Sequence, residues 1–143
     1  MRTVFDTNIL ISGLFWRGAP HHCLLAADAG LVVLVFTEAT VSELRNKLTG
    51  KFKRSVAEVT GVIGRLSAGA EYVPARGRSG WVPEDPDDDK FIDAALSGDA
   101  AIIVTGDRHL LDLKIADGVE IVSARQFLDR LPISSAGADR RPR

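Results

Sequence analysis

Residues Leu31-Val32-Val33-Leu34-Val35-Phe36 form the longest apolar run of the chain. Apolar and polar residues do not alternate in this run, as they would in a strand with one face in water. An unbroken apolar run of this kind is typical of a strand that helices cover on both faces, which occurs mainly in parallel sheets. The run is also far too short to cross a membrane. It predicts the interior of an α/β sheet.

Shorter apolar runs lie on either side of this stretch in the sequence. Thr3-Val4-Phe5 and Ala101-Ile102-Ile103-Val104 are each followed by polar residues and then by an apolar helical pattern. Further strands are predicted at 71–74, as a short edge strand, and at 119–122. Strands alternating with helices predict a three-layer α/β/α sandwich with a mainly parallel central sheet of about four to five strands.

Helix starts are marked by capping and turn residues. The predicted starts are at Pro20, Thr37, Ser55 with Glu58, and Ser123 with Gln126. Pro132 is predicted to stop the last helix. In folds of this class ligands bind beyond the carboxyl ends of the strands, so polar side chains that directly follow a strand are candidates for a site.

The length and composition of the chain limit the classes of protein to which it can belong. With 143 residues, 45% of them hydrophobic, the chain can form one full core. We predict one domain over residues 1–132 and a disordered tail over residues 133–143, where apolar side chains are nearly absent. The net charge of -1 excludes a strongly basic nucleic-acid binder. A polyanion would therefore have to bind to a local patch of basic side chains. The single Cys23 and the absence of a signal segment predict a soluble, cytoplasmic protein without membrane association.

The stretch Asp85-Pro86-Asp87-Asp88-Asp89-Lys90-Phe91-Ile92-Asp93 is unusually acidic and precedes an apolar helical pattern. A helix needs only one or two acids near its N-terminus for capping and for its dipole. Asp85 with Pro86 is interpreted as a turn, and Asp87 and Asp88 as a solvated helix start. Asp89 and Asp93 are four residues apart, so they share a helix face.

Three further acids are placed where they could join this stretch. Asp6 and Asp107 directly follow predicted strands, and Glu43 lies early in a predicted helix. Carboxylates crowded together without a cation would have to take up protons. Mg²⁺ or Mn²⁺ resolves that conflict, because these ions prefer oxygen ligands and keep water molecules that can be activated. Two such ions would suit phosphodiester hydrolysis, and the sequence leaves open whether one or two bind.

Each of these acids also has an ordinary structural explanation. Asp6 is a suitable cap for the helix that starts near Ile9. Glu43 fits a capping box opened by Thr40. Asp107, like Asp89, fits a turn. The joint placement of the acids at strand ends and on flanking helices is what favours a site.

Four motifs in this order resemble those of the PIN-domain nucleases, most closely the bacterial branch of toxins from toxin–antitoxin pairs. The motifs are Val4–Leu10, Thr40–Leu44, Asp85–Ile92 and Val104–Asp107. The resemblance runs from Met1 to about Leu131. It implies a metal-dependent endoribonuclease with Mg²⁺ or Mn²⁺ as cofactor, RNA as substrate, a cognate antitoxin as partner, and a possible homodimer.

The resemblance also implies roles for particular residues. The catalytic and metal-binding quartet would be Asp6, Glu43, Asp89 and Asp107, with Asp93 as an additional metal ligand and Asn8 and Thr105 as supporting residues. The third position of the quartet is open between Asp88 and Asp89. The spacing to Ile92 and Ala95 favours Asp89.

Basic residues gather near Phe52 and are candidates for holding RNA phosphates. They are Lys47, Lys51, Lys53 and Arg54. Arg76 and Arg78 are further candidates, and Trp16 or Trp81 is a candidate for base stacking. The alternative for all of them is an ordinary solvated surface.

The sequence also allows other functions. They include an RNA-processing nuclease outside a toxin system and a catalytically weak interaction module. An aspartyl-phosphate phosphatase is disfavoured, because Asn8 stands where a second Asp would act as general acid. A calcium loop is disfavoured, because Lys90 and Leu96 stand where it needs Gly and Glu.

Overall fold

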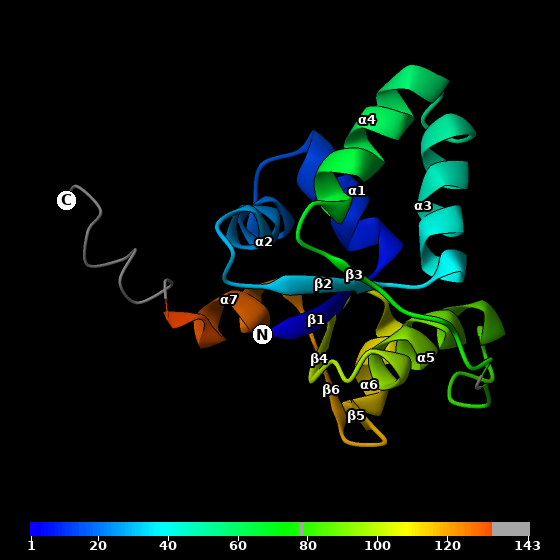
Figure 1. Ribbon diagram of the computed structural model, residues 1–143. Helices are drawn as coiled ribbons and strands as arrows, with labels where there is room; N and C mark the ends of the chain where they lie inside the picture. Colours follow the sequence, from blue (N-terminus) through cyan, green and yellow to red (C-terminus); the bar gives the residue numbers. More distant parts are fainter. Residues whose placement is uncertain (78, 133–143) are drawn as a thin grey trace.

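The computed structural model describes residues 1–77 and 79–132, and a six-stranded sheet lies at its centre (Figure 1). The strand order is β3-β2-β1-β4-β6-β5. The strands are β1 (Arg2–Phe5), β2 (Val33–Phe36), β3 (Glu71–Tyr72), β4 (Ile102–Val104), β5 (Ile115–Ala116) and β6 (Val119–Val122). All pairings are parallel except that between β5 and β6. The predicted α/β sandwich with a mainly parallel sheet is confirmed.

The sheet has one strand more than the sequence predicts. The additional strand β5 pairs with β6 through a hairpin whose turn is Asp117-Gly118. Both turn residues have positive φ, 49° for Asp117 and 85° for Gly118. Asp-Gly is a preferred pair for such a tight turn, because glycine and, to a lesser degree, aspartate tolerate positive φ. The Asp-Gly pair was therefore a signal for this hairpin in the sequence, although the strand before it has only two residues.

Seven α-helices and one short 3₁₀ turn connect the strands over the described ranges. They are α1 (Thr7–Phe15), α2 (Ala19–Asp28), α3 (Glu38–Thr49), α4 (Val56–Ser67), the turn η1 (Pro86–Asp88), α5 (Asp89–Ser97), α6 (Arg108–Leu113) and α7 (Ala124–Arg130). Thr37, Ser55 and Ser123 open α3, α4 and α7 with capping boxes. These three predicted starts are confirmed.

In the central strands β1, β2 and β4, neighbouring residues point to opposite faces of the sheet and enter different cores. Phe5 belongs to the core under α1, α2, α3 and α7, where its ring meets that of Phe127 edge to face at 5.7 Å. Val4 belongs to the core under α5 and α6, together with Ile103. Figure 1 shows these two helical layers on either side of the sheet. Burial on both faces is the reason why the strands are apolar without alternation.

The order of the strands places a topological switch point between β1 and β4. From β1 the chain passes to β2 on one side, and it enters β4 on the other side only after α5. In open α/β sheets ligands bind beyond the carboxyl ends of the strands at such a point, because the connecting segments diverge there. Asp6 and Thr105 are the first residues after β1 and β4.

Within the two described ranges, no helix has both the length and the apolar character that a membrane span requires. The predicted disordered tail at residues 133–143 lies outside the described residues. The division into a domain at 1–132 and a tail stays a prediction.

Candidate metal centre

Asp6 is held rigidly at the switch point. Its side chain is 3% exposed and caps α1, with Oδ1 accepting the Ile9 N–H at 2.8 Å. Its Oδ2 accepts the hydroxyl of Thr105, and its own N–H donates to the Val104 carbonyl at 3.0 Å. The capping role expected for Asp6 is therefore present, and it occupies one oxygen of the carboxylate.

Thr105 links the first and last acids of the site. Besides donating to Asp6, its Oγ1 accepts the backbone N–H of Asp107 at 2.9 Å. Asp107 caps α6, because its Oδ1 accepts the N–H groups of His109 at 2.8 Å and of Leu110 at 3.3 Å. The second Asp107 oxygen remains available to the pocket.

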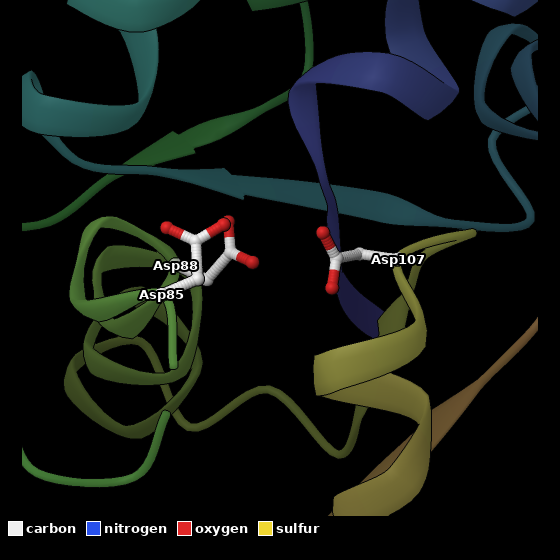
Figure 2. A group of neighbouring side chains, drawn as sticks. All are labelled: Asp85, Asp88 and Asp107. Atoms are coloured by element: carbon white, nitrogen blue, oxygen red, sulfur yellow. The ribbon is translucent and has the colours of Figure 1, made fainter. Parts of the chain in front are cut away.

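Two further carboxylates approach Asp107 from the turn before α5. Oxygen atoms of Asp85, Asp88 and Asp107 lie within 4.8 Å of one another. Figure 2 shows Asp85 and Asp88 on one side of the gap and Asp107 on the other, at the start of α6. The Asp88 Oδ2 is buried and has no hydrogen-bond partner among the described residues.

The electrostatics of this cluster are unfavourable without a cation. Burial, followed by the charges of Asp107 and Asp85, raises the pKa of Asp88 to about 7. Burial also raises the pKa of Asp6, against the lowering effect of the Thr105 and Ile9 hydrogen bonds. The site thus holds more negative charge than its own hydrogen bonds stabilise.

Glu43 lies at the edge of the same site and is already paired. Its Oε2 accepts the hydroxyl of Thr7, and its Oε1 is 2.7 Å from the ammonium group of Lys90. Lys90 also lies 3.2 Å from Asp87 Oδ1. The alternative prediction, a capping box of Thr40 with Glu43, is wrong, since Thr40 is itself the third residue of the box that Thr37 opens.

A cavity of about 170 Å³ lies between the acidic side chains. Its lining consists of Asp6, Thr7, Asn8, Glu43, Lys47, Asp85, Asp87, Asp88, Phe91 and Asp107. The structure therefore brings together Asp6, Glu43 and Asp107 of the predicted quartet. Asn8 lies at the rim, where its Oδ1 accepts the Lys47 ammonium group at 3.4 Å.

The structure does not bring Asp89 into this cluster. Asp89 is 5% exposed, and its carboxylate accepts the backbone N–H groups of Gly80 at 2.9 Å, Trp81 at 3.1 Å and Val82 at 3.0 Å. Three amide donors satisfy a carboxylate without a metal. The cavity wall contains Asp88 and not Asp89, so the structure does not bring the predicted third residue to the other acids.

Asp93 shares the helix face of Asp89, as expected, but that face is turned toward the segment before α5. The Asp93 carboxylate accepts the N–H groups of Arg76 and Gly77, each at 3.2 Å. Asp93 is buried at 4% exposure and does not line the cavity. Asp89 and Asp93 therefore share one face of α5, as predicted. That face packs against the segment before α5 and not against the other acids.

Sequence reasoning missed Asp85 and Lys90 as members of the site. The sequence predicts a turn at Asp85, yet the i,i+3 spacing from Asp85 to Asp88 through the turn η1 places both carboxylates on one side. For Lys90 the sequence indicates only that it disfavours a calcium loop. The available signal was the position of Lys90 directly after three aspartates, where its ammonium group can pair with nearby carboxylates.

The donor set fits a hard divalent cation. The ligand candidates around Asp88 are all carboxylates, and one of their oxygens is buried without a partner. Oxygen donors of this kind suit Mg²⁺ or Mn²⁺, whereas zinc sites generally include His or Cys. The fold and this site define an α/β protein with an acidic cluster at the switch point of its sheet.

Residues 2–109 match the sequence model of the PIN domain, which covers well over half of the chain. The chain belongs to the PIN domain family. PIN domains are generally metal-dependent nucleases, in agreement with an acidic cluster at this position.

Solved structures share the fold. VapBC2 from Rickettsia felis, crystallised bound to a DNA fragment from their promoter, aligns with a TM-score of 0.58 at 12% identity, covering 86% of this chain and 98% of that chain. PAE2754 from Pyrobaculum aerophilum aligns with a TM-score of 0.56 at 16% identity, covering 95% and 90% of the two chains. At these identities the likeness shows the fold alone. No curated protein sequence matches the chain significantly.

Proposed function

We propose that this protein is a divalent-metal-dependent endoribonuclease and the toxin of a toxin–antitoxin pair. The observation that carries the nuclease proposal is the convergence of Asp85, Asp88 and Asp107, with an unpartnered buried oxygen on Asp88, at the switch point of a PIN domain. Asp6 and Glu43 line the same cavity. An antitoxin as partner is proposed from the resemblance to PIN-domain toxins, and the fold shared with VapBC2 agrees with it.

In this proposal Asp88, Asp107 and Asp85 hold Mg²⁺ or Mn²⁺, with Asp6 beside them. A bound cation of this kind stabilises charge on a phosphodiester and activates water for hydrolysis. Thr105 holds the Asp6 carboxylate and the backbone of Asp107 in place through its two hydrogen bonds. Asp89 and Asp93 are proposed as structural anchors for the segment before α5 rather than as ligands.

The remaining polar residues would orient the substrate and balance charge. Lys90 neutralises Glu43, so that the cluster does not carry the full charge of all its acids. Lys47 lies at the cavity rim, where its ammonium group can meet a phosphate oxygen. RNA as substrate, homodimer formation and a cytoplasmic location are parts of the proposal that rest on the family resemblance.

The arrangement of Asp6 argues against the phosphatase alternative. A nucleophilic carboxylate needs an exposed oxygen in line with the phosphate. Both oxygens of Asp6 accept hydrogen bonds, and the side chain is almost fully buried. Hydrolysis by water bound in the cavity fits this geometry better than attack by Asp6.

The test is cleavage of an end-labelled single-stranded RNA with Mn²⁺ or Mg²⁺, compared with the same reaction in chelator. Asp88→Asn and Asp107→Asn are expected to lose cleavage by a factor of about a hundred or more, because each loses a charge that holds the cation. Asp112→Asn is the matched control, an exposed acid on α6 with the same charge change. Cleavage that persists at the wild-type rate in both pocket variants would contradict the proposed site. Cation binding without cleavage would favour an interaction module.

A further inference from the structure

Aromatic and cationic side chains gather where α1 and α3 end. The rings of Phe15 and Phe52 stack at 5.3 Å with an interplanar angle of 29°, and Trp16 meets Phe15 edge to face at 5.9 Å. The guanidinium of Arg54 lies 4.7 Å from the Phe15 ring centroid, and the ammonium of Lys51 lies 5.8 Å from that of Phe52. We call these five residues the aromatic–cation patch. Trp16 is 58% exposed, a large apolar ring left open to solvent.

Two rows of side chains connect this patch with the acidic cavity. Asn8 and Ser12 lie at i,i+4 spacing on α1, and Trp16 follows in extended backbone at the end of that helix. Glu43 and Lys47 lie at i,i+4 spacing on α3, and Lys51 follows in the turn after it. The two helices pack side by side (Figure 1), and the contact between Asn8 and Lys47 joins the rows.

The distance between patch and cavity suits a short stretch of a polymer. Asp6 caps α1 at the cavity, and Trp16 is ten residues further along the chain. At a rise of 1.5 Å per residue the separation along the helix is about 15 Å. This length accommodates about four nucleotides stacked at 3.4 Å.

The charges along this path favour a polyanion. Lys47, Lys51, Lys53 and Arg54 follow one another from the cavity rim to the patch, and Glu58, 3.8 Å from Arg54, is the acid that partly offsets them. Single-stranded nucleic acid is bound by this combination, with cations along the backbone and exposed rings on which bases stack. A protein partner would account for an exposed Trp, but not for its connection to the cavity by a row of cations.

We propose that Trp16, with Lys51 and Arg54, forms a stacking subsite for single-stranded RNA about 15 Å from the acidic cavity. The subsite holds a base outside the cleavage position and orients the strand along α1 and α3. The proposal rests on the proposed nuclease function for the identity of the substrate. It does not depend on the metal.

The test is the affinity for a fluorescently labelled single-stranded RNA of eight nucleotides, measured by anisotropy in chelator so that no cleavage occurs. Trp16→Ala is expected to weaken binding by about 5- to 150-fold, the usual range for loss of one stacked base. Trp16→Phe, which keeps a ring, should recover most of the affinity. Tyr72→Ala, which removes an aromatic ring 50% exposed on the edge strand β3, should leave it unchanged. Lys51→Ala is expected to reduce the slope of log Kd against log salt by about 0.7.

The outcomes separate this proposal from the nuclease function. If Trp16→Ala has the melting temperature of the wild type and binds RNA equally well, the subsite proposal is overturned, even if the wild type cleaves RNA. Loss of self-association in Trp16→Ala at unchanged RNA affinity would also overturn it and assign the patch to a second copy of the chain. Trp16-dependent binding in a protein that shows no cleavage would support the subsite while the nuclease proposal fails.

Discussion

Asp88 and Asp89 are adjacent in the chain, yet the Asp88 carboxylate lines the acidic cavity and the Asp89 carboxylate is surrounded by backbone N–H groups. Asp88 faces Asp107 across the cavity and leaves one buried oxygen without a partner among the described residues. Asp89 accepts three backbone N–H groups from residues 80–82. Successive residues of a helix point about 100° apart, so the start of α5 directs one acid to the site and the next to the preceding segment. The two positions therefore respond differently to the same substitution.

Asp88→Asn is expected to raise the melting temperature in chelator, because it removes one of several carboxylates that repel one another. In the wild type Mn²⁺ should add stability according to its affinity, about 2.7 kcal/mol at a concentration of a hundred times Kd. Most of this gain should be absent in the variant. Thermal unfolding with and without Mn²⁺ measures both effects, with Asp112→Asn as the control. A variant that is less stable in chelator and responds fully to Mn²⁺ would speak against Asp88 as a ligand.

Asp89→Asn is expected to lower the free energy of unfolding by about 1–3 kcal/mol, because the side-chain amide group turns a donor toward backbone N–H groups. The response to Mn²⁺ should persist. Chemical denaturation with and without the ion tests this. The reverse result, higher stability in chelator and no response to the ion, would return Asp89 to the ligand set.

In the metal-free protein, the contribution of Asp88 to stability should decrease as the pH rises from about 4 to about 7. The pKa of Asp88 is about 7 in the folded state against an ordinary value of 3.8, so the folded protein binds this proton more tightly than the unfolded chain. The stabilisation is complete below pH 3.8 and disappears as the pH passes 7. The burial of Asp6 acts in the same direction.

The measurement is the melting temperature in chelator at pH 5.5 and pH 8, taken as the difference between wild type and Asp88→Asn. Pairs such as Glu120 with Arg130, which lowers the pKa of the Glu120 carboxyl, act in the opposite direction and are common to both proteins. A difference between the two proteins that does not change with pH would rule out the raised pKa of Asp88.

Lys90→Met removes the cation that pairs with Glu43 and Asp87. Cleavage is expected to fall by about ten- to a hundredfold, because Glu43 loses the contact that positions it. The affinity for Mn²⁺ should rise, since the site loses a competing positive charge. Lys90→Arg should keep most of the activity. Titration of the cleavage rate with Mn²⁺ separates the two effects, and a joint fall of rate and affinity would indicate a folding defect instead.

Thr105→Val removes a fully buried hydroxyl at nearly constant volume. Asp6 Oδ2 and the Asp107 N–H both lose their partner, which is expected to cost about 1–3 kcal/mol of stability. Thr105→Ser keeps the hydroxyl and should be close to wild type in denaturation and in cleavage. Equal stability of Thr105→Val and wild type would mean that Thr105 does not couple the two acids.

Several features of the fold could be predicted because they depend on neighbouring residues only. Leu31–Phe36 predicts a buried strand through its composition, and Thr37, Ser55 and Ser123 predict helix starts through their capping hydrogen bonds. The strand β5 was not predicted, because two residues are too few to show the alternation of apolar and polar residues that marks a strand. Its Asp-Gly turn was the better guide.

The sequence by itself determined the α/β class, the PIN family and the acids that directly follow β1 and β4. Asp6 and Asp107 belong to the site because the carboxyl ends of adjacent parallel strands meet at one edge of the sheet. Only the tertiary structure placed Asp88, and not Asp89, in the cavity wall, and only it brought Lys90 to Glu43 and Phe52 to Phe15. Local periodicity tells which residues share a face of a helix. Which segment packs against that face depends on the course of the chain between distant elements.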